Sequence, residues 1–163
     1  MVIVIMGVAG AGKTTVGRRL AETIHADFVD ADDFHPPANI EKMSHGLALS
    51  DDDRGPWLDA LSHAIDEWLR TGRRVVLACS ALKAKYRVAL RRDPQRVLFV
   101  YLKVSPEVAR ERVARRAAHF MRGDLVENQF DTLEEPGGAI VVDGSQTPEE
   151  IIGRLLPLLP ADR

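Results

Sequence analysis

Several features that define whole classes of proteins are missing from this sequence. It has one cysteine, Cys79, so no disulfide can form within the chain, and we expect a small buried residue there. Lysine and arginine number 22 and aspartate and glutamate 24, which leaves no excess positive charge to attract nucleic acid. No apolar run approaches a membrane span, and the first one, 2–6, is too short for the core of a signal peptide. We therefore expect a cytoplasmic protein without nucleic-acid or membrane partners.

What the sequence has instead is an ordinary globular composition in an alternating pattern. Its 163 residues, 45% apolar and 28% charged, suit a single domain over 1–163. Strands are predicted at 2–6, 27–32, 74–79, 96–102 and 139–144. Helices are predicted at 13–25, 56–72, 83–93, 105–120 and 147–159. Apolar strands separated by helices predict an α/β three-layer sandwich with a five-stranded parallel sheet, which binds ligands beyond the carboxyl ends of its strands.

The ends of two predicted helices carry clear signals. In the helix 56–72, apolar residues recur at helical spacing, Pro56 suits the first turn and Gly72 suits the C-terminal end. The last helix opens with Thr147 and Glu150 at the spacing of a capping box, in which each residue bonds the backbone N–H of the other. These signals place the helix boundaries that we expect.

The segment GVAGAGKTT, residues 7–15, matches the pattern G-x-x-x-x-G-K-[ST] and joins the first predicted strand to the first predicted helix. Glycine permits a tight turn and close approach, so several backbone N–H groups can contact one phosphate, and the helix N-terminus adds its positive dipole end. Lys13 can reach the outer phosphates, and the Thr14 hydroxyl can ligate Mg²⁺. The segment therefore predicts a polyphosphate site. The expected binding residues are Gly7, Gly10, Gly12, Lys13, Thr14 and Thr15.

Three aspartates follow the second predicted strand. Asp30 and Asp32 have strand spacing, so their side chains point the same way if the strand continues that far. Phosphoryl transfer needs a group that orients or deprotonates the attacking hydroxyl, and ligands for Mg²⁺. We expect Asp32 to serve the hydroxyl and Asp30 the metal, while Asp33 faces solvent; a solvated acidic turn is the alternative. For His35, a hydrogen bond to substrate and packing of the loop both remain open.

Five segments together resemble the small P-loop gluconokinases. They read GVAGAGKTT, DADDFHPPANIEKMSHGLALSDDDRGPWL, CSALKAKYR, YLKVSPEVARERVARRAAHFM and NQFDTLEEP, and they span residues 2–136. Shikimate kinases share the loop and the fold but lack HPPANIEKM, DDDRGPW and CSALK. The resemblance implies a nucleoside-monophosphate-kinase-like fold, with a substrate-binding region at about 33–56 and a mobile helical lid at about 112–130. It also implies ATP-dependent phosphorylation of D-gluconate at its 6-hydroxyl group, Mg²⁺ and a homodimer.

The resemblance also implies roles for individual residues. Lys13, Asp32 and Arg116 would be catalytic, with Arg116 bringing positive charge from the lid to the transferring phosphoryl group. Arg112, one helical turn earlier, would contact adenine or serve the lid hinge, while His119 and Phe120 would pack within the lid. The substrate pocket would contain Asp32, His35, Lys42, Arg54, Ser80 and Lys83.

Alternatives stand beside these expectations. Arg54 could pair with an aspartate of 51–53 instead of a substrate carboxylate. Lys83 and Arg87 could lie on a solvated helix face, which we favour for Arg87. A kinase of another small polyol acid, shikimate-like, or a nucleotide-binding switch without a substrate are the other functions. Two departures from the family pattern, Asn128 before QF and a short link at 134–143, concern the lid.

Overall fold

The computed structural model describes residues 1–116 and 124–161, and a five-stranded parallel sheet forms its centre. The strands are β1 (Val2–Met6), β2 (Asp27–Asp30), β3 (Val75–Ala78), β4 (Val97–Lys103) and β5 (Ile140–Asp143). Their order across the sheet is β2-β3-β1-β4-β5, so β1 pairs with both β3 and β4. The five strands and their parallel arrangement confirm the predicted fold class.

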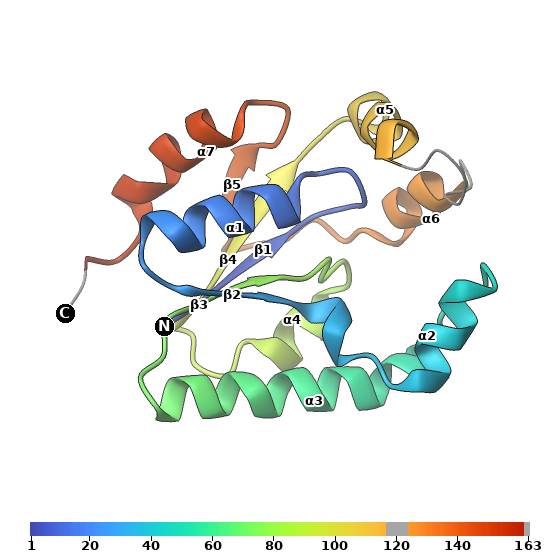
Figure 1. Ribbon diagram of the computed structural model, residues 1–163, viewed down its shortest axis with the longest axis horizontal. Coiled ribbons are helices and arrows are strands. Elements are labelled where there is room, and N and C mark those ends of the chain that lie inside the picture. The colour runs from blue at the N-terminus through green and yellow to red at the C-terminus, as the bar shows by residue number, and fades with distance from the viewer. Residues whose placement is uncertain (117–123, 162–163) are drawn as a thin grey trace.

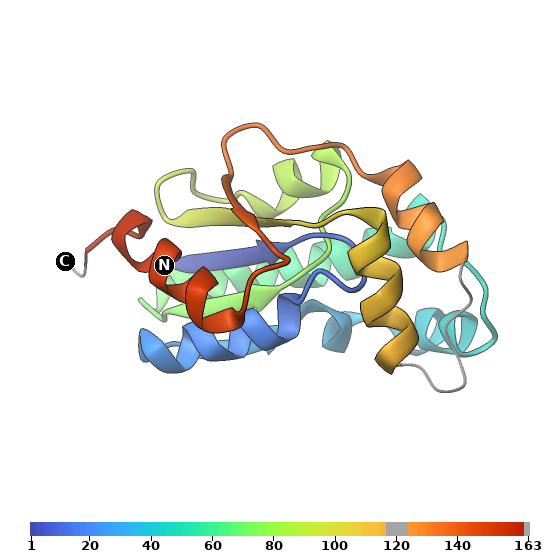
Figure 2. The ribbon, with the colours of Figure 1, turned by 90° about the horizontal axis from the view of Figure 1, so that it is seen from above.

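Helices cover both faces of the sheet and surround one end of it. α1 (Lys13–Thr23) and α7 (Pro148–Leu155) lie on one face, and α3 (Asp51–Arg70) and α4 (Ala84–Leu90) lie on the other (Figure 1). α2 (Pro37–Ser44), α5 (Pro106–Arg116) and α6 (Asp124–Thr132) lie toward the end where the strands point, as Figure 2 shows from above. Two short 3₁₀ helices, η1 (Ala31–Phe34) and η2 (Leu156–Leu158), complete the described elements.

The central strand, β1, shows why the strands of this sheet consist of continuous apolar residues. Every residue of β1 is buried, and successive side chains enter different core clusters. Ile3 and Ile5 pack in the cluster shared with α1 and α7, whereas Val4 and Met6 pack in the cluster shared with α3. A strand covered on both faces has no polar side, and this absence is the signal that predicted a three-layer sandwich.

The boundaries of α3 correct one prediction and confirm another. The helix begins at Asp51 rather than near Pro56, because Ser50 and Asp53 form a capping box that starts it five residues earlier. Pro56 therefore lies inside the helix, contrary to its predicted place in the first turn. At the other end Gly72 has φ +71°, the left-handed conformation expected of a glycine that terminates a helix.

The second strand is shorter than predicted, which changes how its aspartates lie. It ends at Asp30, and the chain turns into the 3₁₀ helix η1 because the Asp30 carboxylate accepts a hydrogen bond of 2.9 Å from the N–H of Asp32. Asp30 and Asp32 are therefore not successive side chains on one face of a strand. The polar region that follows contains α2, which the sequence pattern did not reveal. The predicted capping box of Thr147 and Glu150 is confirmed at the start of α7.

The proposed lid falls partly outside the described residues. Its predicted members His119, Phe120 and Arg122 belong to 117–123, which the structure does not describe. The described parts are the end of α5 and all of α6. Nowhere in 1–116 or 124–161 does a helix have both the length and the apolar character that crossing a bilayer requires.

Candidate functional site

The loop between β1 and α1 has the backbone of an anion-binding loop. Gly10 and Gly12 have φ +82° and +95°, and a Cβ on Gly10 would lie 2.6 Å from the carbonyl oxygen of Ala109. Only glycine allows this turn to lie so close to α5. Within the described part of the chain, five backbone N–H groups from Gly10 to Thr15 lack hydrogen-bond partners and are free to bind an anion. They belong to Gly10, Gly12, Lys13, Thr14 and Thr15.

Lys13 is the first residue of α1, and its side chain is partly buried beside this loop. Its Nζ donates a 3.1 Å hydrogen bond to the Val8 carbonyl. Burial lowers its pKa, and the nearby carboxylates of Asp32 and Asp30 act in the opposite direction. A desolvated cation beside unpaired amides is poised to interact strongly with a bound phosphate.

Residues of α1, α5, α7 and the turn after β5 line a cavity of about 300 Å³ next to the loop. The Arg112 Nη1 atom donates to the carbonyls of Gly10 and Ala11, each at 3.3 Å. Three residues predicted for the site, Thr15, Arg112 and Arg116, line this cavity together. Sequence reasoning missed other residues of its lining, among them Arg115, Gly144 and Gln146. Its size and its position beside the phosphate loop suit a nucleotide.

Asp32 lies at the carboxyl edge of the sheet, near Lys13 and Asp30. Its side chain is 81% exposed to the open site. The protein around it nevertheless limits its hydration and raises its pKa, and the charge of Asp30 raises the pKa further. The structure thus brings three predicted site residues together, the cation Lys13 and the carboxylates Asp30 and Asp32, of which Asp32 has a raised pKa.

His35 is a fixed part of this edge. Its ring stacks on Trp57, with centroids 4.8 Å apart and planes at 9°, and its side chain is 6% exposed. The Asn39 side-chain amide lies 3.2 Å from His35 Nδ1; because that amide nitrogen is a donor, the neutral ring carries its proton on Nε2. Nε2 lies 3.8 Å from the Asp32 carboxylate. His35 therefore packs in the loop through its stack on Trp57, while its Nε2 edge faces Asp32.

A group of cations surrounds Asp51 at the start of α3. The carboxylate of Asp51 accepts hydrogen bonds from Lys83 at 3.0 Å, from Lys85 at 2.5 Å and from the Tyr86 hydroxyl. These bonds, led by that of Lys85, lower its pKa. Arg54 lies 3.9 Å from Asp51, so the predicted alternative of an ion pair for Arg54 is present. Four positively polarised groups against one carboxylate leave this region attractive to a second anion.

Arg54 and Lys42 differ in how much of their side chains remains free. Arg54 Nη1 donates to the Tyr86 hydroxyl at 3.2 Å, and its other nitrogens have no hydrogen-bond partner within 1–116 and 124–161. Lys42 forms an ion pair of 2.8 Å with Asp53, so it is engaged in the loop that begins α3. Ser80 accepts the Gly7 N–H at its carbonyl, 3.3 Å away, which joins the loops after β1 and β3.

Arg87 corrects a prediction. It is buried instead of lying on a solvated face, with 9% of its surface exposed. Its Nη1 donates to the carbonyls of Ala81 and Leu82, at 2.8 and 3.0 Å. Ala81 has φ +45°, which is unfavourable for a residue with a Cβ, so Arg87 secures a strained turn between Ser80 and Lys83. Lys83 also departs from the solvated-face alternative, because it precedes α4 and binds Asp51.

Cys79 is buried at the end of β3, as predicted. Burial raises the pKa of its thiol to about 12, so it is an inert thiol near Lys13 and not a nucleophile. In the described residues, no group of three or more His, Cys, Asp or Glu side chains could hold a metal alone. Any cation here would need ligands from a bound substrate as well.

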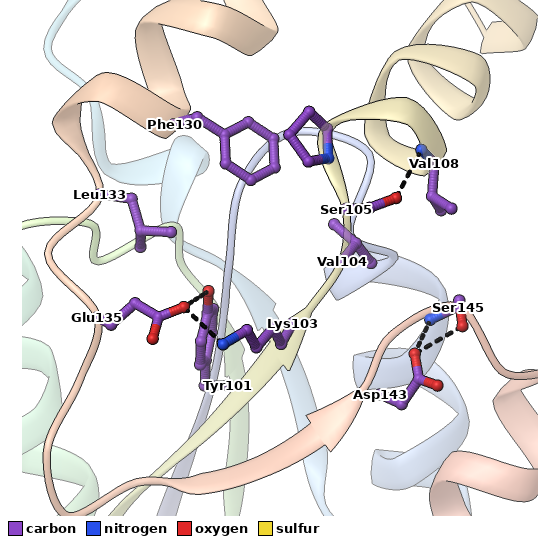
Figure 3. A pocket seen from close by; sticks show the side chains of 11 residues that line it. Tyr101, Lys103, Val104, Ser105, Val108, Phe130, Leu133, Glu135, Asp143 and Ser145 are labelled. Carbon is purple, nitrogen blue, oxygen red and sulfur yellow. Dashed lines mark hydrogen bonds and ion pairs between the residues drawn. The ribbon is translucent and has the colours of Figure 1, made fainter.

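A second cavity, of about 510 Å³, lies on the other side of α5, between the ends of β4 and β5 and α6 (Figure 3). Apolar side chains form most of its wall, and at its base Glu135 binds Lys103 at 2.9 Å and the Tyr101 hydroxyl at 3.4 Å. No sequence signal predicted this cavity. Its lining includes Val104, Val108, Phe130 and Leu133.

The fold and the site define the class of the protein. A parallel sheet, a glycine-rich loop before a helix N-terminus and a partly buried lysine beside sheet-edge carboxylates are the parts of a P-loop kinase. In agreement, residues 2–136 match the model of the AAA domain family.

Comparison with known proteins identifies the family within this class. The chain is 40% identical to the thermoresistant gluconokinase of Escherichia coli K12 over 162 residues, covering 97% of this chain and 93% of that one. A gluconokinase structure from Sinorhizobium meliloti 1021 superposes with a TM-score of 0.84 at 43% identity, covering 95% and 89% of the two chains. Shikimate kinase from Aquifex aeolicus, 20% identical with a TM-score of 0.58 over 97% and 95%, shares the fold alone. The chain belongs to the gluconokinase family.

Proposed function

We propose that this protein transfers the γ-phosphoryl group of ATP to the 6-hydroxyl group of D-gluconate, giving 6-phospho-D-gluconate and ADP. The observation that supports the proposal is that Asp32 lies close to Lys13 and to His35, and that His35 in turn lies close enough to Arg54 to be affected by its charge. Asp32 thus belongs to a chain of neighbours that begins at the phosphate loop and leads to the cation group. A donor phosphate on one side and an anionic, hydroxyl-rich acceptor on the other suit this arrangement, as does membership of the gluconokinase family.

The nucleotide half of the site would hold the triphosphate by its backbone. The unpaired amides of the loop would bind phosphate oxygens, with Gly7 allowing the turn after β1, and Lys13 would offset charge on the outer phosphates. Arg112 and Thr15 line the adjoining cavity, where the rest of the nucleotide would bind. Arg116, which also lines it, would stabilise charge on the transferring group.

Mg²⁺ is the metal that this chemistry implies, and the residues present fit it. The Thr14 hydroxyl makes no hydrogen bond to any described residue, and only one carboxylate oxygen of Asp30 is engaged. Both are hard oxygen ligands, and Mg²⁺ commonly takes one or two such protein ligands together with phosphate oxygens. When bound, the ion would neutralise charge on the phosphates.

The acceptor half of the site would recognise gluconate through charge and hydrogen bonds. The free nitrogens of Arg54, with Lys83 nearby, would bind the gluconate carboxylate. His35, Ser80 and Lys42 would contact the hydroxyl groups of the chain. Asp32 would accept the proton of the 6-hydroxyl as its oxygen bonds to the γ-phosphorus, while the bond from that phosphorus to the β,γ-bridging oxygen breaks and its electron pair leaves with ADP.

Several broader expectations are part of the same proposal. Residues 1–163 would form one kinase domain, with acceptor binding at about 33–56 and a lid at about 112–130. The protein would act in the cytoplasm, consistent with its single, buried cysteine. A homodimer is proposed on the family resemblance, and light scattering after gel filtration would measure it.

The direct test is ATP consumption with Mg²⁺ across a panel of acceptors. The panel contains D-gluconate, other sugar acids, shikimate, nucleoside monophosphates and no acceptor. We expect strong stimulation by D-gluconate alone, with ³¹P NMR of the product showing a phosphate ester at the 6-position. Stimulation by another acceptor would overturn the substrate but not the kinase, and no stimulation at all would favour a nucleotide-binding switch.

A further inference from the structure

The end of α6 and the turn after it, residues 129–134, contact both halves of the proposed site. We name this stretch the link segment. Its first residue, Gln129, accepts a hydrogen bond of 2.7 Å at Oε1 from the backbone N–H of Ala9. Ala9 belongs to the phosphate loop and lies 120 positions earlier in the chain. This hydrogen bond therefore attaches α6 to the phosphate loop.

The last residue of the link segment, Glu134, makes hydrogen bonds to the turn around Lys83, on the acceptor side of the site. Its Oε2 accepts the N–H of Ala84 at 2.7 Å, and its own backbone N–H donates to the Leu82 carbonyl at 2.9 Å. Lys83 lies between those two partners. The same carbonyl of Leu82 is also held by Arg87. Glu134 therefore fixes the turn that presents Lys83 to the cation group.

Packing alone does not determine where the link segment lies. Between its two polar ends, Phe130 and Leu133 contact the core but also form a wall of the 510 Å³ cavity (Figure 3). A cavity of this size offers little resistance to a shift of the apolar side chains. The hydrogen bonds of Gln129 and Glu134 consequently set the position of the segment relative to the two loops.

The Ala9 amide is not needed as a phosphate donor. The loop amides from Gly10 onward, as named above, lack partners among the described groups and remain for the anion. Gln129 pairs with the amide of Ala9, which precedes these residues in the loop. Its contact is thus compatible with a bound phosphate and fixes the loop in the shape that binds one.

We propose that Gln129 and Glu134 are positioning residues, which hold the phosphate loop and the Lys83 turn at a fixed spacing through the link segment. The inference rests on the proposed function for the identity of the acceptor. The part that concerns Gln129 requires only that the loop binds ATP. Among residues 1–116 and 124–161, the backbone hydrogen bond between the two loops is the 3.3 Å bond from Gly7 to Ser80, which is longer than the 2.7 Å bonds that Gln129 and Glu134 accept.

The donor side is tested with Gln129→Met, which keeps the length of the side chain but removes the amide oxygen. Asn128→Ala is the matched control, because Asn128 is the exposed neighbour and its side chain makes no hydrogen bond within the described chain. Loss of one hydrogen bond predicts about five- to tenfold weaker ATP binding by calorimetry for Gln129→Met. The control is expected to bind ATP as the unaltered protein does.

The acceptor side is tested with Glu134→Ala, Glu134→Gln and the control Glu135→Ala, whose exposed side chain binds Lys103 instead. Glu134→Ala is expected to raise KM for D-gluconate about five- to tenfold without changing KM for ATP. Glu134→Gln keeps an acceptor for the Ala84 N–H and is expected to restore KM to within about twofold of the unaltered value. Glu135→Ala is expected to leave both KM values unchanged.

Each contrary result overturns the proposal. Tighter ATP binding by Gln129→Met would mean that Gln129 competes with phosphate for the Ala9 amide. Lower melting temperatures with unchanged ATP affinity and KM values would mean a purely structural role. If the unaltered protein binds ATP but does not use D-gluconate, the proposed function fails, and the calorimetry of Gln129→Met still decides the positioning role.

Discussion

The imidazole ring of His35 lies parallel to the indole of Trp57, at a centroid distance of 4.8 Å. Trp57 is itself fixed, because its Nε1 donates a 2.7 Å hydrogen bond to the Ala31 carbonyl in η1. The stack joins α3 to the residue that follows η1, so it connects this helix to the segment that carries Asp32. Burial in this stack lowers the pKa of His35.

The lowered pKa of His35 leads to a pH dependence of defined sign. Below the ordinary value of 6.5 the unfolded chain takes up a proton at His35 before the folded chain does, so the free energy of unfolding falls as pH decreases from about 6.5 toward the folded pKa. NMR titration is expected to give a His35 pKa below 6.5, with the ring neutral at pH 7. His35→Gln is expected to flatten the dependence of stability on pH below 6.5. A His35 pKa above 6.5 would contradict this.

Replacement of Lys13 is expected to lower the rate of phosphoryl transfer without lowering the stability of the fold. Burial lowers the pKa of its ammonium, whose hydrogen bond among residues 1–116 and 124–161 goes to a carbonyl, so Lys13→Ala removes charge stabilisation without breaking an ion pair within those residues. We expect kcat to fall at least about 100-fold and the melting temperature to stay the same or rise. A coupled ATPase assay and thermal unfolding measure the two quantities. Turnover close to that of the unaltered enzyme would refute the role of Lys13.

Asp32→Asn removes the proposed proton acceptor while keeping the shape of the side chain. We expect kcat to fall about 10²–10⁴-fold with little change in ATP affinity. Because the pKa of Asp32 is raised, and the ionised form is the base, activity should decline as pH falls through a value above 3.8. The residual activity of Asp32→Asn should lack this acid limb. If ATP affinity collapses instead, Asp32 belongs to the metal site.

Arg87 connects stability to the acceptor site. Arg87→Met leaves the carbonyls of Ala81 and Leu82 without the guanidinium, at a cost of about 1.5–3 kcal/mol in the free energy of unfolding. The strained Ala81 turn would relax, so KM for D-gluconate should rise as well. Denaturant unfolding and steady-state kinetics test both effects. The exposed neighbour Val88, changed to alanine, is the control and should alter neither quantity.

The parts of the site that were predicted from sequence are those whose chemistry is local. The strand, glycine loop and helix of 2–23 are contiguous, and a phosphate loop works through its own backbone, so the pattern alone predicted it. The five strands were predicted for a similar reason, since burial on both faces leaves an apolar run. Burial of Cys79 followed from its place at the end of such a run.

The parts that were missed depend on contacts between distant segments or on competing local signals. Pro56 indicated a helix start, but the capping box of Ser50 and Asp53 begins the helix earlier. Arg87 resembles a residue on a polar helix face until the chain before it folds back and offers two carbonyls. The bond from Gln129 to Ala9 spans 120 residues, and no periodicity within either segment indicates it.

Asp53 offers a stability test in the acceptor region itself. Lys42 and the N–H of Ser50 both bond its carboxylate and lower its pKa to about 2 from the ordinary 3.8. A carboxylate whose folded pKa is depressed stabilises the fold at pH values above 3.8, and this contribution is lost as pH falls from 3.8 toward 2. Asp53→Ala should therefore melt a few degrees lower than the unaltered protein at pH 7, and the difference should shrink at pH 2.5. Asp52→Ala, an exposed neighbour in the same turn, serves as the control and should show no such pH-dependent difference. A deficit for Asp53→Ala that is as large at pH 2.5 as at pH 7 would show that the side chain acts through packing rather than through its charge.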